Sequence, residues 1–581
     1  MTKKQKAGKR VLFVPSLKKS DGLYRMRRSF RLAVELGDEA SVFLGDERQQ
    51  DIFSRDEIYV VFGFPKKKAL KDLQSGPRWD FIVFDRGCTS LEELKIFSPH
   101  ADLLIGIDEE GPAREYLSYL IDTLPGMRGE PNVSSIAFLD TPPHQHEITP
   151  ELKKFLLIFP GAAYHETAQI VADILLKDGL AVSDTVAVAS FPGGNQGRFP
   201  ERVLLLNPAE IREQYFKYDM VITSCSYSAV EAIHAGVPTV CIASTPEEYE
   251  RFRRIGLPQL SAAELKWDQL LKYMKRPERL IDQVSPLIAH TRRSLSLFLT
   301  ELDVRSGNLC PCCGKGDNRV VHRETLRSFF RCRACGAVYT QCFSRYGIPL
   351  RRATTGGEQQ GVSLEVLKAS RKLFLQRLKL IRVLLGPQKR ERGLLEVGCS
   401  YGAFSSVALD EGFKPFCIDY DSSAAAYVQE ILKIPSCTVR FEDLDRKKSN
   451  LPEPFDAVTI WNAFDHFESL DPLLRTINSL LTKGGVFALS ASNIAGAGAK
   501  KNLSGFLESL PFHHRFVVSP QILQGILKRY GFTVRAVRSR GGLRIAEQSK
   551  SRKASVWERM VNIMRPGDVF ELYAVKDRSL S

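Results

Sequence analysis

Five cysteines crowd into one short segment, and their spacing is that of a metal site. Cys310 and Cys313 form one C-x-x-C knuckle, Cys332 and Cys335 form a second, and eighteen residues lie between the knuckles (332 − 313 − 1). Two such knuckles turn four thiolates toward one point, which suits tetrahedral Zn²⁺. The sequence therefore predicts a structural zinc ribbon, with Cys312 as a spare thiol able to replace either neighbour. The alternative is a set of reduced cysteines that bind no metal.

A second group of residues has the chemistry to bind a nucleoside. Residues 394–397 are a short apolar strand, and Gly398 and Gly402 follow it in a turn that leads into a helix. Glycine permits the turn and lets the backbone approach a ligand closely. Asp419 ends the next expected strand, 21 positions after Gly398 (419 − 398). A carboxylate at that place can accept hydrogen bonds from both hydroxyls of a ribose.

The order of elements after this turn resembles that of class I S-adenosylmethionine-dependent methyltransferases. The resemblance extends over further expected strands and helices, at 455–462, 470–481, 486–490, 531–537 and 569–575. It implies a Rossmann-like fold whose last two strands are antiparallel. It also implies a methyl donor in place of NAD, because the turn lacks G-x-G-x-x-G spacing. A doubly wound domain without a cofactor is the alternative.

The resemblance implies roles for residues around the donor. Glu396 is implied to meet the methionine ammonium, and Asp443, with Glu442 close behind it, is implied to lie near the adenine. Trp461 opens the loop after the fourth strand, which in the family faces both donor and acceptor, so it joins the implied cofactor-binding residues.

The same loop supplies candidate catalytic residues. Asp465-His466 stands where the family often carries Glu-His, and a histidine there can take a proton from an acceptor hydroxyl. The alternative is a histidine that only fixes the loop. His514, in the segment 513–520, resembles part of the acceptor-pocket flank of small-molecule and sugar methyltransferases. Methyl transfer is an in-line displacement that positioning alone can promote, so a base is optional.

Residues 9–275 alternate strands and helices twice, which predicts two parallel sheets with helices on both faces. Asp85 and Asp108 end strands, where they are either ligand-binding residues or helix caps. The helix that begins near Ala229 offers free N–H groups to a phosphate, and Glu231 on its first turn is placed to reach a ribose.

These two halves resemble the GT-B architecture, and more closely the nucleotide-sugar hydrolases of the pseudaminic acid pathway and their glycosyltransferase relatives. The best match is residues 218–238, with a serine-bearing loop, a glutamate and Gly-x-Pro. Arg25 stands in place of a family histidine and cannot act as a base, so hydrolysis, glycosyl transfer and plain binding all stay open. The resemblance implies nucleotide-sugar contacts at Arg25, Arg28, Asp85, Gly161, Ser226, Ser228 and Glu231.

Composition sets outer limits on function. The 581 residues carry a formal net charge of +15, which favours anionic partners, although a solvated basic surface explains it equally well. Residues are 44% hydrophobic, as in globular proteins. No apolar run reaches the roughly 18 residues of a membrane span, and no signal peptide is evident, so we expect a cytoplasmic protein.

We expect an α/β chain that methylates a sugar or glycan-pathway intermediate and carries a nucleotide-sugar-binding region. One alternative is an RNA methyltransferase whose zinc ribbon grips nucleic acid, and another is a methyltransferase with an inactive N-terminal docking module. The expected segments are 1–147 and 148–275 (the two Rossmann-like halves), 276–305 (helical linker), 306–345 (zinc ribbon), 346–385 (linker and helix) and 386–581 (methyltransferase).

Overall fold

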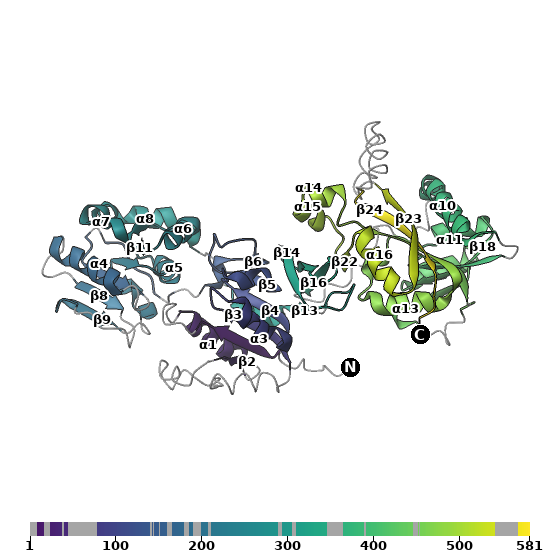
Figure 1. Cartoon of the computed structure of the whole chain (residues 1–581). Coiled ribbons are helices and arrows are strands. Elements are labelled where there is room, and N and C mark those ends of the chain that lie inside the picture. Colours follow the sequence, from purple (N-terminus) through teal and green to yellow (C-terminus); the bar gives the residue numbers. More distant parts are fainter. Residues whose placement is uncertain are drawn as a thin grey trace. The chain divides into compact units, whose positions relative to one another are not determined.

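The chain forms two compact units, one of them N-terminal (Figure 1). The first comprises Met1–Val304, Arg323–Leu326 and Phe343–Tyr346; the second comprises Arg305–His322, Arg327–Cys342 and Gly347–Ser581. The computed structural model describes residues 9–16, 24–37, 40–43, 78–139, 142, 144–149, 151–159, 165–178, 185–189, 199–206, 211–288, 293–304, 309–344, 364–387, 391–444, 451–452, 454–540 and 567–580.

Two six-stranded parallel sheets make the frame of the first unit, in agreement with the alternation of the sequence. The first sheet has the order β2-β1-β3-β4-β5-β6, with strands Ala40–Val42, Val11–Pro15, Trp79–Asp85, Ala101–Ile107, Tyr119–Asp122 and Val133–Ser134. The second has the order β12-β11-β10-β7-β8-β9, with strands Gln259–Ser261, Thr239–Ala243, Met220–Thr223, Lys154–Ile158, Thr185–Ala189 and Val203–Leu206.

Helices pack on both sheets of this unit. They are α1 (Tyr24–Leu36), α3 (Leu91–Phe97), α4 (His165–Asp178), α5 (Ser226–His234), α6 (Pro246–Ile255), α7 (Trp267–Met274), α8 (Pro277–Val284) and α9 (Leu295–Glu301). The last two fall in the expected linker, yet both bury apolar faces. Phe298 and Leu299 of α9 join the core of the first sheet, and Val284 of α8 joins a core cluster with α5 and α6. The linker residues therefore close the unit.

A seven-stranded sheet dominates the second unit, in the order β19-β18-β17-β20-β21-β24-β23. Its last two strands in the chain, β23 and β24, form the expected antiparallel pair; β24 is also antiparallel to β21, and the remaining neighbouring pairs are parallel. The strands are Ser436–Thr438, Phe413–Asp419, Arg392–Val397, Phe455–Ile460, Leu481–Ser492, Val569–Lys576 and Phe532–Arg540. The helices are α10 (Leu364–Leu385), α11 (Ala403–Asp410), α12 (Ser422–Glu430), α13 (Leu470–Leu480), α14 (Ala497–Lys501), α15 (Leu503–Glu508) and α16 (Pro520–Arg529).

Strand register brings the functional loops to one edge of this sheet. Val397 of β17 pairs with Ile418 of β18, and Glu396 pairs with Thr459 of β20. The three central strands thus end at nearly the same level, so the turns that follow them lie side by side. Gly398 has a φ of 73°, and a Cβ there would lie 2.9 Å from the Cβ of Ala463 in the loop after β20. Glycine is therefore required for the two loops to approach this closely.

Most of the predicted ribbon belongs to the second unit. Its strands are β14 (Asn318–Glu324), β15 (Arg327–Cys332) and β16 (Val338–Ser344), and β16 pairs antiparallel with β22 (Phe516–Val517) from the methyltransferase segment. Phe330 and Tyr339 share one hydrophobic core with Phe516. The expected boundary between ribbon and methyltransferase is therefore bridged by strand pairing and packing. Among the described residues, no helix combines the length and apolarity needed to cross a membrane.

Candidate active site

A pocket of about 210 Å³ opens at the carboxyl edge of the seven-stranded sheet. In parallel sheets this edge is where ligands bind. The pocket is lined by the turns after β17 and β18, the segment around residue 441, the loop after β20 and the segment before β22. The lining includes Gly398, Asp419, Tyr420, Phe441, Glu442, Ala463, His466, His513 and Arg515.

Asp419 is held in place by two backbone donors. Its Oδ2 accepts a hydrogen bond from the Ser400 N–H (2.7 Å) and its Oδ1 accepts one from the Asp421 N–H (3.0 Å). Burial raises the pKa of this carboxyl group, and the backbone donors oppose the shift. Each oxygen keeps a second lone pair, so the carboxylate can still accept hydrogen bonds from a diol. The sequence-based assignment of Asp419 to a ribose thus matches a residue that lines the pocket.

Glu396 and Gly402 stand behind the pocket wall. Glu396 is buried and accepts a hydrogen bond from the Ser405 hydroxyl. Burial raises its pKa to about 8, against the opposing effects of that hydrogen bond and of the Arg377 charge. Gly402 has a φ of 72°, and a Cβ there would lie 2.8 Å from Val428 of α12. Both residues support the turn, and a contact between Glu396 and a ligand ammonium stays a prediction.

Two residues implied to bind the cofactor lie outside the pocket lining. Phe441–Asp443 is a 3-10 turn in which neighbouring side chains point about 120° apart, so Phe441 and Glu442 line the pocket while Asp443 is exposed. Trp461 is buried instead against α10, with the guanidinium of Arg377 4.0 Å from its ring centroid. The structure therefore favours Glu442 over Asp443 for the adenine side.

Two histidines, His466 and His513, line the pocket, and His514 is buried beside them. The ring centroids of His466 and His513 are 4.2 Å apart, and the ring of His514 lies 5.3 Å from His466 and 5.2 Å from His513. Burial lowers the pKa of His466 to about 4; Asp465 opposes this shift, and the charges of the other two histidines add to it. His466 is therefore neutral at pH 7. Sequence reasoning did not single out His513, although its position directly before His514 was a usable signal.

A buried carboxylate orients this wall. Asp465 Oδ2 lies 3.0 Å from His514 Nδ1 and accepts a 2.9 Å hydrogen bond from the Ser492 hydroxyl. Burial alone would raise the pKa of Asp465, but the hydrogen bond and charge of His514, with help from His466 and Ser492, lower it to about 2. The carboxylate is therefore ionised and holds His514 Nδ1 as its donor, which leaves His514 Nε2 as the other ring nitrogen.

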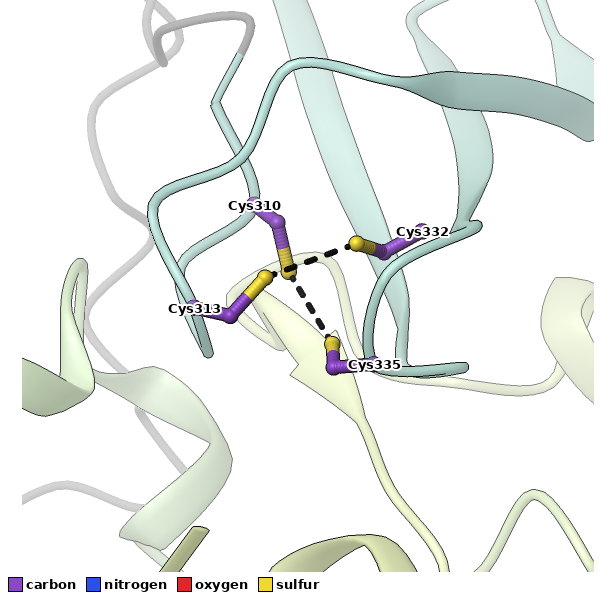
Figure 2. Close-up of side chains that lie close together, drawn as sticks. All are labelled: Cys310, Cys313, Cys332 and Cys335. Carbon is purple, nitrogen blue, oxygen red and sulfur yellow. Dashed lines mark hydrogen bonds between the residues drawn. The ribbon is translucent and has the colours of Figure 1, made fainter. Parts of the chain in front are cut away.

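The four predicted zinc ligands converge on one point. Figure 2 shows their sulfurs turned toward one another from two turns of the ribbon. Cys310 Sγ lies 3.7 Å from Cys335 Sγ, and Cys313 Sγ lies 3.5 Å from Cys332 Sγ. Four sulfurs at about 2.3 Å from a tetrahedral zinc are roughly 3.8 Å apart, so the arrangement fits the ion. Cys312 is buried and lies outside this set of four.

In the first unit, the predicted anion-binding arginines are already paired. Arg28 donates from Nη2 to Asp85 Oδ1 (2.6 Å) and from Nη1 to Asp108 Oδ2 (2.9 Å), and Arg25 Nη1 lies 3.3 Å from Asp85 Oδ1. All four side chains are buried. Two cations thus neutralise two anions inside the unit, so these arginines have little charge to offer a phosphate.

A tyrosine occupies the start of α5, within the serine-bearing loop predicted from the sequence. Tyr227 donates a 2.9 Å hydrogen bond to Asp108 Oδ2, and its ring stacks on Tyr24 with centroids 4.2 Å apart. Further along α5, Glu231 is buried and accepts a hydrogen bond from the Tyr215 hydroxyl (3.1 Å). Burial raises the pKa of Glu231 to about 7. Ser226 and Ser228 lie on the first turn of the same helix, and Gly161 lies outside the described residues.

Comparison with known proteins identifies the second unit. The family model described as "Methyltransferase domain" matches residues 369–537. The C-terminal part of the chain is an S-adenosylmethionine-dependent methyltransferase domain. The match begins within α10, so this helix belongs to the domain, and it covers both walls of the pocket. Gly398 and Asp419 lie within the matched residues and line the pocket, and their contact with a methyl donor stays a prediction.

Solved methyltransferase structures also align with this chain. An S-adenosylmethionine-dependent methyltransferase from Archaeoglobus fulgidus is 20% identical, with 36% of this chain and 97% of that chain covered and a TM-score of 0.27. The N-methyltransferase NodS from Bradyrhizobium japonicum is 15% identical, with 36% and 97% covered and a TM-score of 0.24. One from Mesorhizobium loti is 16% identical, with 36% and 99% covered and a TM-score of 0.26. No curated protein matches the chain.

We predict that Asp419→Asn weakens S-adenosylmethionine binding by about tenfold to a hundredfold, because hydrogen bonds to a charged group contribute roughly 1.5–3 kcal/mol. Isothermal titration calorimetry measures the change. Asp443→Asn is the matched control, because it removes the same charge from an exposed position outside the pocket lining. Equal losses in the two variants would contradict the placement of the ribose at Asp419.

We predict that the ribbon releases about one equivalent of zinc per chain when its thiolates are modified. Cys313→Ser should abolish this release, because three thiolates and a neutral hydroxyl hold the ion poorly. Cys312→Ser should keep it, since its sulfur is not among the four that converge. A colorimetric zinc indicator follows the release, and zinc loss in the Cys312 variant would show that the ligand set is different.

Proposed function

We propose that this enzyme methylates a hydroxyl or amine of an anionic sugar or glycan-pathway intermediate, and that its first unit binds a nucleotide-linked sugar. The observation that carries the proposal is one pocket whose lining joins Asp419 on the donor side to His466 and His513 on the other side. A methyl donor held at Asp419 would thus share its space with a wall of imidazoles.

When bound, S-adenosylmethionine supplies an electrophilic methyl group on a sulfonium sulfur. The turn at Gly398 leaves room for the donor, and Asp419 accepts hydrogen bonds from its ribose. His466 and His513 line the acceptor side and assist loss of the acceptor's proton. Transfer then depends chiefly on holding the acceptor atom in line with the methyl group.

Two arginines among the lining residues support an acceptor that carries a phosphate. Arg440 and Arg515 both line it. Both form ion pairs with glutamates at more than hydrogen-bond distance: Arg515 Nη2 lies 3.6 Å from Glu468 Oε1, and Arg440 lies 3.8 Å from Glu442 Oε2 and 3.7 Å from Glu468 Oε1. Guanidinium groups bind phosphates through paired hydrogen bonds, so these arginines suit a sugar phosphate or nucleotide sugar.

The ribbon zinc has a structural role in this proposal. Four protein thiolates leave no open coordination position, so the ion takes no part in chemistry. It fixes β15 and β16, and through them the segment that carries His513 and His514, because β16 pairs with β22 just beyond these histidines.

A second candidate function for the first unit is docking without ligand turnover. Tyr227 and the buried pairs of Arg25 and Arg28 favour it, because they occupy the place where the resembling hydrolases and transferases would bind an anionic substrate. The GT-B-like sheets would then present a surface and perform no reaction.

We predict methyl transfer from radiolabelled S-adenosylmethionine to a member of a panel of nucleotide sugars and sugar phosphates, with His466→Ala about a hundredfold slower. Calorimetric titration of the whole chain with UDP-sugars separates nucleotide-sugar binding from docking. The alternative, an RNA methyltransferase, is tested by measuring RNA binding at low and high salt, because the affinity for RNA would fall steeply as salt rises. Methylation of RNA without any transfer to sugars would contradict the proposal.

A further inference from the structure

We infer that His466, His513 and His514 form a second metal site, one that holds a divalent transition metal at the acceptor side of the pocket. The inference rests on the proposed function and assigns a means of action to the imidazole wall. Nitrogen atoms from the three rings all lie within 4.8 Å of one another. An ion at the centre of such a triangle is no more than about 2.8 Å from each nitrogen (4.8/√3).

Small inward movements of the rings would complete coordination. Zinc–imidazole distances are about 2.0–2.1 Å, so each nitrogen needs to move by less than about 1 Å. His466 and His513 are only partly buried and line the pocket, which leaves room for such movement. Three imidazoles also match a known ligand type for zinc, nickel, iron and copper, all of which accept neutral ring nitrogens.

The surroundings of His514 are those of a metal ligand. A metal-binding histidine commonly donates its other ring N–H to a carboxylate, which fixes the tautomer and the ring orientation. Here the buried Asp465 carboxylate lies 3.0 Å from Nδ1 of His514 and is itself bound by the Ser492 hydroxyl. With Nδ1 held by this carboxylate, we assign coordination of the ion to Nε2 of His514.

The state of His466 points the same way. Its Nε2 is buried and, among the described residues, has no hydrogen-bond partner; Asp465 Oδ1 lies 3.8 Å away, beyond hydrogen-bond distance. A buried polar atom without a partner is costly, so it calls for an explanation such as a bound ion. A metal ion at the centre of the three rings would supply the missing interaction.

This site would differ from the ribbon in being open. The four cysteines fill a tetrahedron, whereas three histidines leave at least one position for a ligand from the pocket. An acceptor hydroxyl that occupies this position would lose its proton more readily, because a bound cation lowers the pKa of a coordinated oxygen. His466 would then act as a metal ligand, and the favoured acceptors would carry a hydroxyl.

The test is a calorimetric titration of the full chain with Co²⁺ and Ni²⁺, after the ribbon has been loaded with one equivalent of zinc. We expect one further site, and at least tenfold weaker binding in His513→Ala and in His466→Ala. Phe512→Ala is the control, because it changes an exposed neighbour that has no metal ligand. Retained S-adenosylmethionine binding shows that each variant is folded, and X-ray absorption of the Co²⁺ complex should show nitrogen neighbours.

Two results would overturn the inference: no metal binding beyond the ribbon, or unchanged binding in both histidine variants. If methyl transfer persists in a chelator that leaves the ribbon zinc in place, the second metal has no role in the reaction, but the proposed function still holds. If the metal binds but no sugar is methylated, the proposed function is wrong and the metal site still stands.

Discussion

Hydrogen bonds from two separate segments hold the backbone of His514 and Arg515. The positions of the three histidines at the pocket depend on these bonds. From the ribbon, Thr340 donates its N–H to the carbonyl of Arg515 (2.8 Å) and its hydroxyl to the carbonyl of His514 (2.8 Å). From the sheet edge, Asp465 accepts the N–H of Arg515 at its carbonyl (2.7 Å). The backbone that carries His513 and His514 therefore has little freedom to shift.

A buried arginine of the ribbon holds the preceding residues of the same segment by further hydrogen bonds. Arg327 of β15 donates from Nη1 to the carbonyl of Leu510 (3.0 Å) and from Nη2 to that of Glu508 (3.2 Å), at the end of α15. A cation is favourable at a helix C-terminus, where unpaired carbonyls concentrate negative charge. The knuckles, β15 and β16 thus anchor both α15 and the segment that enters the pocket.

Much of the second unit followed from local patterns. The strands before Gly398 and Asp419 were readable because parallel strands are apolar throughout, and the cysteine spacing selected the four thiolates that converge. Orientation within short turns was not readable. In the turn at 441–443, a shift of one residue decides whether Glu442 or Asp443 faces the pocket. Three residues are too few for a periodic pattern to show which one does. Successive side chains alternate between the two faces of a strand, so the side that Trp461 faces depends on where β20 ends. The sequence does not fix that position.

Long-range pairing was also beyond the sequence. Nothing local indicates that Thr340 meets His514, or that Arg25 and Arg28 pair with Asp85 and Asp108, because these contacts join segments far apart in the chain. The arginines looked like anion ligands when considered alone, and only the fold reveals the carboxylates that neutralise them.

The central claim is that one pocket places a methyl donor opposite a wall of histidines. The most direct measurement is a crystal structure of the full chain with S-adenosylhomocysteine. The account predicts a ribose bound to Asp419, a turn of backbone at Gly398 against the ligand, and a sulfur that faces His466 and His513. A ligand whose sulfur points away from these histidines, or one bound outside this pocket, would contradict it.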